Sequence, residues 1–344
     1  MKAYSFWNNK GGVGKSFLCF AASSEYARSH RSADVYVLDL CPQANVTETL
    51  LGGQERGAQA LDQILGRRLR PTIAGYLEAR ISSPFVTLPT VEPYLTHVSE
   101  HNKAIPDNLF LVCGDNILEL LSEAIRQTSQ LILPSDAWKR VIEWVRDLAD
   151  QLTALSGERE VLVFVDCNPS FAIYTQQALI AADQIVVPFT ADDSSRRGIE
   201  NVIALLFGIS PNDMVPYARL SFADRAQENG VRLPSLAAFV SNRVTMYGNT
   251  PSAAFRGVAA TIGKTVDRIY DEHPTIFADS SLPPSSSFLT VPDYHAACIV
   301  ASVSGTPIHN LQPGPYSVGE ETTQLNRDPL DRYRESLEEL VRRL

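Results

Sequence analysis

An α/β fold, with a mostly parallel, doubly wound sheet flanked by helices, is the fold class that the sequence predicts. The chain opens with a strand-like run at residues 3–7, a glycine-rich loop at 9–16 and a helical stretch at 17–29. Residues 35–40 then form an apolar, β-branched run without alternation, which is typical of a strand buried on both faces. Strand, loop, helix and strand in this order make a βαβ unit, whose two strands lie parallel.

Later segments repeat this alternation. Continuous apolar runs predict three further strands at residues 161–165, 185–189 and 237–241. Helical patterns are found at 137–155, 174–182 and 195–207. A closing amphipathic helix is expected at 329–344, where apolar residues recur with helical spacing at Tyr333, Leu337, Leu340, Val341 and Leu344.

The length of the chain fits one large domain or two small ones, and we expect a single domain over residues 1–344. Two segments are expected to be insertions into it. Residues 52–107 contain several prolines, a basic cluster and no clear strand, and residues 211–234 form the second insertion. The serine- and proline-rich stretch 280–287 predicts a turn or a mobile loop.

The composition is ordinary for a soluble globular protein, with 44% hydrophobic and 20% charged residues. No apolar run approaches the roughly 20 residues that cross a bilayer, and the first residues lack the apolar core of an export signal. The five cysteines are scattered without CxxC pairs, which favours reduced thiols over a disulfide frame or a zinc site. We therefore expect a cytoplasmic bacterial protein. If the protein binds DNA, we expect it to be associated with the nucleoid.

The formal net charge of −9 disfavours binding of the protein as a whole to nucleic acid or to an anionic membrane. One region departs from this balance. Residues 215–270 hold seven basic residues against three acidic ones, the basic residues being Arg219, Arg225, Arg232, Arg243, Arg256, Lys264 and Arg268. The region is either a local basic patch or a solvated surface with a chance bias.

The strongest chemical signal is the segment 10–16, which reads Lys-Gly-Gly-Val-Gly-Lys-Ser. It fits the P-loop pattern G-x-x-x-x-G-K-S/T, with Asn9 in the place of the first glycine. Glycines let backbone N–H groups turn toward phosphate oxygens, and the following helix N-terminus adds partial positive charge. Lys15 is expected to contact the β- and γ-phosphates of ATP, and Ser16 to bind Mg²⁺. The other predicted nucleotide contacts are Gly11, Gly12, Val13, Gly14 and Phe17. The alternative is a glycine-rich turn that binds no ligand.

This segment resembles the deviant Walker A motif of ParA, MinD and the nitrogenase iron protein, which are P-loop ATPases of the SIMIBI class. The resemblance covers most of the chain and favours the ParA branch. It implies a homodimer that forms on ATP binding, in which Lys10 crosses the interface to phosphates held by the other subunit. A second cation near the γ-phosphate is physically sensible, because charge builds there during phosphoryl transfer. The alternative is a surface lysine beside a loop.

Four further segments carry the resemblance. Residues 39–45 look like the family's second motif, usually Asp-x-Asp-Pro-Gln, and residues 108–119 resemble its following strand and loop. Residues 165–170 look like the Walker B region, usually Asp-Cys-Pro-Pro-Ser, although this chain has Asn168 at the first of the two prolines. Residues 178–188 fit the next family segment, a helix leading into a strand that ends in proline.

Two carboxylates are predicted to join Ser16 around the metal. Asp166 ends a buried strand on the phosphate side of the sheet, and Asp39 ends a neighbouring strand. A carboxylate in this position commonly holds Mg²⁺, often through water. The alternative for each is an aspartate that caps the next helix.

The chain departs from the family at the residue that orients the attacking water. The resemblance implies a second aspartate there, but this sequence has Cys41, and a neutral thiol is a weak hydrogen-bond partner that cannot accept a proton as a carboxylate does. With Lys10, Lys15, Asp39 and Cys41 as the catalytic group, we expect slow ATP hydrolysis. Asp192 and Asp193 could supply the missing carboxylate, or they could form a turn and cap for the helix that follows.

The resemblance also implies an adenine side to the site. Asn242 and Arg243 follow the strand at 237–241, and in relatives an Asn at this strand end faces the adenine. Residues 291–293, with Pro292 at their centre, resemble a later adenine-side loop. Asn242 could instead be only a turn residue.

Two functions remain open. The first is a DNA- or plasmid-partitioning or cargo-positioning ATPase, which would bind DNA nonspecifically through Arg243, Arg256, Lys264 and Arg268 and be released by a partner protein encoded nearby. The second is a nucleotide-gated regulatory or assembly subunit, for example of a defence system, that uses ATP binding more than turnover. A metabolic transferase would need a substrate-specific acid–base pair, which we do not find. Membrane binding by the last helix is not expected, because that helix carries Glu335, Glu338 and Glu339.

Overall fold

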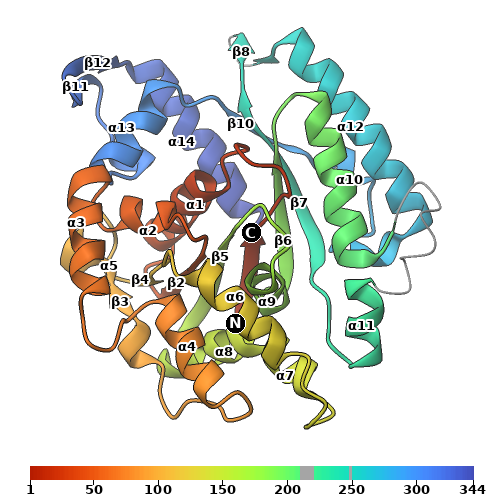
Figure 1. Cartoon of the computed structure of the whole chain (residues 1–344). Coiled ribbons are helices and arrows are strands. Elements are labelled where there is room, and N and C mark those ends of the chain that lie inside the picture. The colour runs from red at the N-terminus through yellow and green to blue at the C-terminus, as the bar shows by residue number, and fades with distance from the viewer. Residues whose placement is uncertain (210–220, 248–249) are drawn as a thin grey trace.

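The computed structural model describes residues 1–209, 221–247 and 250–344. Its centre is a sheet with the strand order β10-β7-β6-β1-β5-β2-β4-β3 (Figure 1). Only the edge pair β3 and β4 is antiparallel. The strands of the sheet are β1 (Lys2–Phe6), β2 (Ala33–Leu40), β3 (Thr96–His97), β4 (Leu109–Val112), β5 (Glu160–Cys167), β6 (Gln184–Phe189), β7 (Ser235–Val244) and β10 (Leu289–Pro292). The predicted fold class is therefore confirmed.

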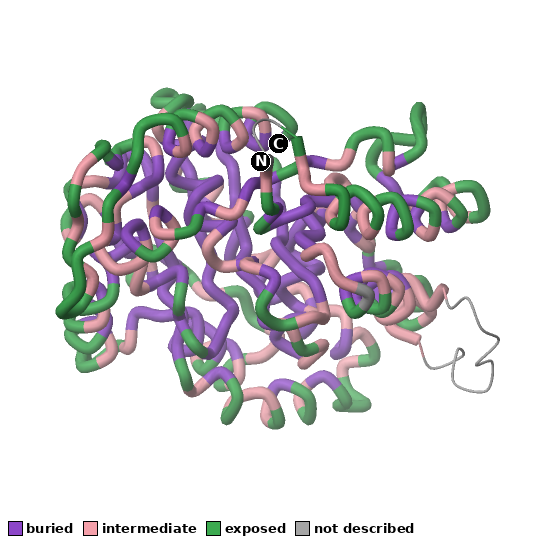
Figure 2. The backbone as a smooth tube through the Cα atoms, turned by 90° about the horizontal axis from the view of Figure 1, so that it is seen from above, coloured by how far each residue is buried: buried purple, intermediate pink, exposed green. Residues whose placement is uncertain are grey.

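Helices cover both faces of this sheet and bury two separate apolar cores. The first core is formed with α4 (Ile73–Ser82), α6 (Leu118–Thr128), α7 (Ala137–Ile142), α8 (Trp144–Leu155), α9 (Ile173–Ala181), α10 (Asp193–Phe207), α11 (Phe222–Glu228) and α12 (Ala253–Glu272). The second is formed with α1 (Lys15–Ser29), α2 (Asn45–Leu50), α3 (Gln54–Leu65), α5 (Val98–His101), α13 (Ala296–Ser304) and α14 (Arg327–Arg342). Figure 2 shows the buried residues concentrated along the centre and the exposed ones around it.

Strand β5 explains why the central strands read as unbroken apolar runs. Val161, Val163 and Val165 pack into the first core, whereas Leu162 and Phe164 pack into the second. Because helices cover both faces of the sheet, the residues that point to either face are apolar, and the strand shows no alternation of polar and apolar residues.

The register of the central strands brings the glycine-rich loop, Asp39 and Asp166 to one edge of the sheet. Phe6 at the end of β1 pairs with Asp166 of β5, and Asp166 pairs with Asp39 of β2. The glycine-rich loop that follows β1 therefore starts beside both aspartates. The carboxyl ends of parallel strands are where open α/β sheets bind their ligands.

Some elements differ from their predicted form. The helix expected at 137–155 is two helices, α7 and α8, divided at Glu143. The segment 52–107 contains helices and also the two-residue strand β3, for which the sequence shows no clear signal. Of the second insertion, residues 211–220 lie outside the described part, and the remainder includes α11. The stretch 280–287 ends in a 3₁₀ turn, Pro284–Ser287.

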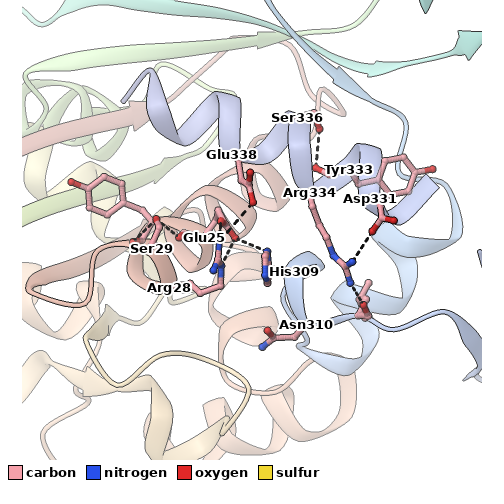
Figure 3. A network of polar contacts seen from close by, with 12 residues as sticks. Glu25, Arg28, Ser29, His309, Asn310, Asp331, Tyr333, Arg334, Ser336 and Glu338 are labelled. Atoms are coloured by element: carbon pink, nitrogen blue, oxygen red, sulfur yellow. Dashed lines mark hydrogen bonds and ion pairs between the residues drawn. The ribbon is translucent and has the colours of Figure 1, made fainter. Parts of the chain in front are cut away.

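The amphipathic C-terminal helix forms as expected, with its bounds at Arg327–Arg342. Figure 3 shows how it meets α1. Arg28 binds the buried Glu25 through two nitrogens, at 3.0 and 2.5 Å, and lies 3.9 Å from Glu338 of α14. His309 Nδ1 lies 3.6 Å from the same Glu25 carboxylate. These contacts join α14 to the helix that follows the P-loop.

Short elements complete the chain. Two small hairpins, β8 (Met246–Tyr247) with β9 (Thr250–Pro251) and β11 (Gly314–Val318) with β12 (Glu321–Leu325), stand outside the main sheet. Among the described residues, no helix combines the length and the apolar character that crossing a membrane requires.

Candidate functional site: a P-loop cavity

The glycine-rich loop has a backbone that only glycine fits well. Gly12 and Gly14 have φ angles of 77° and 81°, in the left-handed region where a side chain is strained. A Cβ at Gly14 would also lie 2.5 Å from Asn242 Nδ2. Asn9, at the position of the pattern's first glycine, donates from Nδ2 to the carbonyl oxygen of Pro169 at 3.0 Å. Asn9 thus ties the start of the loop to the segment after β5.

A cavity of about 700 Å³ opens over this loop. That volume lies within the range of small-molecule sites. The lining residues with a predicted role are Gly11, Gly12, Gly14, Lys15, Ser16, Phe17, Cys41 and Arg243. The cavity is also lined by residues that no sequence motif selects, namely Glu48, Thr49, Gln54, Ser302 and Val303. They come from α2, α3 and α13; α2 and α3 follow the 39–45 segment closely, whereas α13 is about 250 residues further along the chain.

Lys15 brings a buried positive charge to the floor of the cavity. Only 7% of it is exposed, and its Nζ donates to the carbonyl oxygen of Lys10 at 3.3 Å. Burial lowers the pKa of Lys15, and the nearby Asp166 opposes that shift. A desolvated ammonium group of this kind gains most from an anion such as phosphate.

Lys10, the second lysine of the loop, is held away from the cavity by its own subunit. Its Nζ contacts Asp192 Oδ2 at 2.5 Å, Thr190 Oγ1 at 3.0 Å and Ser195 Oγ at 3.2 Å. Partial burial acts to raise the pKa of Asp192, but the hydrogen bonds from Lys10 and its neighbours outweigh it and hold that pKa well below its usual range. Asp192 also accepts from the Ser195 N–H at 3.0 Å, so it caps α10, as the turn-and-cap interpretation predicts.

Asp166 is a buried carboxylate with few donors around it. It is fully buried at the end of β5, and neither carboxyl oxygen accepts a well-formed hydrogen bond from the residues that the structure describes. Burial, and then the neighbouring Asp39, raise the pKa of Asp166, while Ser16 and Lys15 act in the opposite direction. Buried carboxylates without donors are costly unless a cation compensates them. The pair Asp166 and Ser16 therefore fits Mg²⁺.

Asp39 is buried like Asp166, but its oxygens are already occupied. Oδ1 accepts the Cys41 N–H at 3.0 Å, and Oδ2 accepts the N–H and hydroxyl of Thr47 at 3.2 and 2.7 Å. Burial raises its pKa, and these hydrogen bonds lower it. Because Thr47 lies in the first turn of α2, these contacts favour the helix-capping alternative for Asp39, and its metal role stays a prediction.

Cys41 lines the cavity at the position where the family motif has an aspartate. Its thiol donates to Gln43 Oε1 at 2.8 Å. Burial, followed by the charges of Asp39 and Asp166, raises the pKa of Cys41 to about 12. The group is therefore a neutral thiol at physiological pH, which neither accepts a proton nor acts as a strong nucleophile.

The residues predicted for the adenine side divide into two places. Asn242 Nδ2 donates to the carbonyl oxygen of Val13 at 2.9 Å, and Arg243 follows with a φ of 57° at the cavity lining. Val13 itself is fully buried. Pro292, at the end of β10, lines a separate cavity of about 410 Å³ beside Tyr333 of α14. Asn242 thus holds the backbone of the glycine-rich loop. Contact of Asn242, Arg243 or Pro292 with the adenine base stays a prediction.

The predicted DNA-binding residues are also divided. Arg256, Lys264 and Arg268 are exposed along α12, at spacings of four and eight residues that keep them near one side of the helix. Arg243 is instead at the nucleotide cavity. Arg219, which contributes to the basic count, lies outside the described residues.

Comparison with known proteins identifies the family of this chain. The family model described as "AAA domain" matches residues 1–212. The chromosome-partitioning ATPase Soj of Treponema pallidum is 26% identical over 199 residues, which are 58% of this chain and 60% of Soj. The chain spans about three fifths of the length of the curated relatives it matches.

Two solved structures share the fold. The ATP complex of a McdA variant from Cyanothece has a TM-score of 0.60 and 14% identity, covering 100% of this chain and 96% of that one. A plasmid partition protein of Borrelia burgdorferi bound to AMPPNP has a TM-score of 0.53 and 16% identity, with coverage of 100% and 99%. The family model covers more than half of the chain and the fold agrees with that of these proteins, so the chain belongs to the AAA-domain family as a P-loop ATPase of the ParA/MinD type.

Proposed function

We propose that this protein is an ATP-dependent dimerisation switch of the partition or positioning kind, with slow ATP hydrolysis. The observation that carries the proposal is the contrast between the two lysines of the loop. Lys15 lies buried in the cavity, whereas Lys10 is held on its own subunit by Asp192. Lys15 would bind the nucleotide of its own chain, and Lys10 would become available to the nucleotide of the other subunit when it leaves Asp192.

The cavity residues can hold Mg·ATP as follows. Backbone N–H groups of the loop and Lys15 would bind the β- and γ-phosphates, and Ser16 with Asp166 would hold Mg²⁺. The ion would neutralise charge that develops on the phosphate oxygens. Arg243, at the rim, would be close to the bound nucleotide.

The contact between Lys10 and Asp192 is weak enough to exchange. The two side chains are 23% and 45% exposed, and an ion pair at such exposure contributes about 0–1 kcal/mol. The γ-phosphate of a partner's ATP, in a water-excluded interface, is a stronger acceptor for the ammonium group. ATP-bound dimerisation would thus replace an intramolecular partner of Lys10 by an intermolecular one.

Replacing Lys10 by alanine should leave ATP binding intact and prevent dimerisation. Light scattering with Mg·ATP should give a dimer, with a mass twice 37.8 kDa, for the wild type and a monomer for Lys10→Ala. Asp192→Asn is the matched variant, because asparagine still caps α10 but no longer attracts Lys10. We expect it to dimerise at lower ATP concentration. Equal ATP-dependent masses for Lys10→Ala and the wild type would refute the cross-subunit role.

Nonspecific DNA binding is part of this proposal and is supported by the exposed basic residues of α12. Replacing Arg256, Lys264 and Arg268 by glutamate should abolish DNA retention on a gel in Mg·ATP. The loss of three cationic contacts per subunit should also lower the slope of log affinity against log salt by about 3 per subunit. Arg243 is left unchanged because it lies at the nucleotide cavity, so ATP binding should be retained. Undiminished DNA retention by the triple variant would contradict this assignment.

The second candidate is a nucleotide-gated assembly subunit that binds ATP without useful turnover. The neutral Cys41 thiol, already bonded to Gln43, favours it. Measured turnover with and without DNA and the genomic-neighbour protein distinguishes the two: stimulation by either partner supports the positioning ATPase, and an ATP dimer that persists with both partners supports the assembly subunit.

A further inference from the structure

Asn168 and Cys41 follow the ends of two paired strands. Leu40, the last residue of β2, is opposite Cys167, the last residue of β5, and Cys41 and Asn168 are the residues that come next. Both line the cavity. The family motif has proline at the position of Asn168, so this chain has two departures from the motif next to each other: a carboxylate is missing, and an amide is present.

The hydrogen bonds around Asn168 determine which way its amide faces. The Tyr174 hydroxyl donates to Glu119 Oε1 at 2.6 Å, and because a carboxylate only accepts, the single phenolic proton is used there. Burial, and then Glu119, raise the pKa of Tyr174 to about 12, so the hydroxyl keeps this proton. The Tyr174 oxygen can therefore only accept from Asn168, whose Nδ2 lies 2.7 Å away. This places the carbonyl oxygen, Oδ1, on the other side of the amide.

Asn168 is held in this orientation from two directions. Its backbone carbonyl accepts from Trp7 Nε1 at 3.1 Å, and both Trp7 and Tyr174 are fully buried. Its Oδ1 accepts no hydrogen bond from the residues that the structure describes. Two aspartates that the sequence suggested for this region are committed to other groups: Asp192 to Lys10 and the start of α10, and Asp39 to Thr47 and the Cys41 N–H. Asn168 Oδ1 is thus a fixed acceptor, without a donor among the described residues, on a residue that lines the cavity.

We propose that Asn168 Oδ1 positions the water that attacks ATP, and that Tyr174 acts through it as a positioning residue; this rests on the proposed ATPase function. Oδ1 accepts one water O–H, which directs the water's lone pair toward the γ-phosphorus. The new oxygen–phosphorus bond forms as the bond to the β,γ-bridging oxygen breaks, and that electron pair leaves with ADP. The amide takes no proton, so the water's proton passes to a phosphate oxygen. Amide side chains orient attacking water in other P-loop enzymes.

The test is a double-mutant cycle in single-turnover hydrolysis at saturating Mg·ATP, with ATP affinity and melting temperature measured for every variant. Asn168→Ala should slow hydrolysis by roughly 10–100-fold with ATP affinity unchanged. Tyr174→Phe should slow it less, by about three- to tenfold, because the amide then keeps only its longer 3.5 Å contact with Glu119 Oε1 and is held less firmly. In the Asn168→Ala background, Tyr174→Phe should have no further effect, which is the signature of a residue acting through Asn168. Tyr36→Phe, which removes another buried hydroxyl bonded to Ser156 at 2.7 Å, is the control and should match the wild type.

Each outcome decides a different statement. A wild-type hydrolysis rate in folded Asn168→Ala would overturn the role of Asn168. Additive losses in the double variant would overturn the role of Tyr174. Wild-type protein that binds ATP and does not hydrolyse it would overturn this inference but leave the dimerisation switch standing. Wild-type protein that does not bind ATP would overturn the proposed function itself.

Discussion

Lys15→Ala is expected to abolish binding of Mg·ATP. The Lys15 ammonium is buried and desolvated, and its only hydrogen bond to a described residue is the 3.3 Å contact with the Lys10 carbonyl. The Lys15 ammonium group can therefore form hydrogen bonds and an ion pair with a phosphate. Removing one member of a buried charge pair costs roughly 2–5 kcal/mol, which corresponds to about 30- to 5,000-fold in affinity. Titration with a fluorescent ATP analogue and Mg²⁺ should show this loss directly.

The fold of Lys15→Ala should be retained, which separates the loss of binding from unfolding. Burial disfavours the Lys15 charge and Asp166 favours it, so the two effects of removing the charge oppose each other and the melting temperature should change little. Lys103→Ala removes an exposed lysine and should change neither quantity. Micromolar ATP affinity in folded Lys15→Ala would refute the P-loop assignment.

The sequence predicts the central strands well because burial on both faces leaves a simple pattern. Strands β1, β2, β5, β6 and β7 all appear where apolar runs are found. Helix α12 was not predicted, since glycines and β-branched threonines interrupt its pattern. The stripe Ile262, Val266 and Ile269, which the first core buries, makes it a helix. Helix α13 is nine residues long and begins with a short apolar run, in which helix and strand cannot be told apart by periodicity.

For the site, the sequence predicts the residues of a motif and not their distant partners. The P-loop and the cavity contacts of Lys15 and Cys41 could be predicted because neighbouring residues in the chain form them. The contact of Lys10 with Asp192 joins residues 182 positions apart. Asp39 and Asp166 both end a buried strand and look equivalent in the sequence. They differ in the structure, because Thr47 and the Cys41 N–H donate hydrogen bonds to the carboxylate of Asp39. Such differences depend on packing between segments, which periodicity does not contain.

Cys41→Asp is expected to speed ATP hydrolysis and shorten the life of the ATP dimer. Asn168 can aim water, but an amide cannot accept its proton, whereas a carboxylate at position 41 could do both. The gain should be on the order of 10²–10⁴-fold, or about 3–5 kcal/mol of the barrier. The variant places a third carboxylate near Asp39 and Asp166, which are already buried together, so its ATP affinity should be measured separately from its rate.

Single-turnover hydrolysis at saturating Mg·ATP, followed by dimer lifetime on dilution, isolates the effect of the new carboxylate. Cys41→Ser is the matched control, because a hydroxyl can replace the thiol's bond to Gln43 but cannot take a proton at neutral pH. It should hydrolyse ATP at close to the wild-type rate. If Cys41→Asp binds ATP and is no faster than Cys41→Ser, the thiol is not what limits turnover. If Asn168→Ala also loses most of its hydrolysis rate, the Asn168 amide is sufficient to align the water. The barrier to hydrolysis is then set by charge on the phosphate rather than by proton transfer.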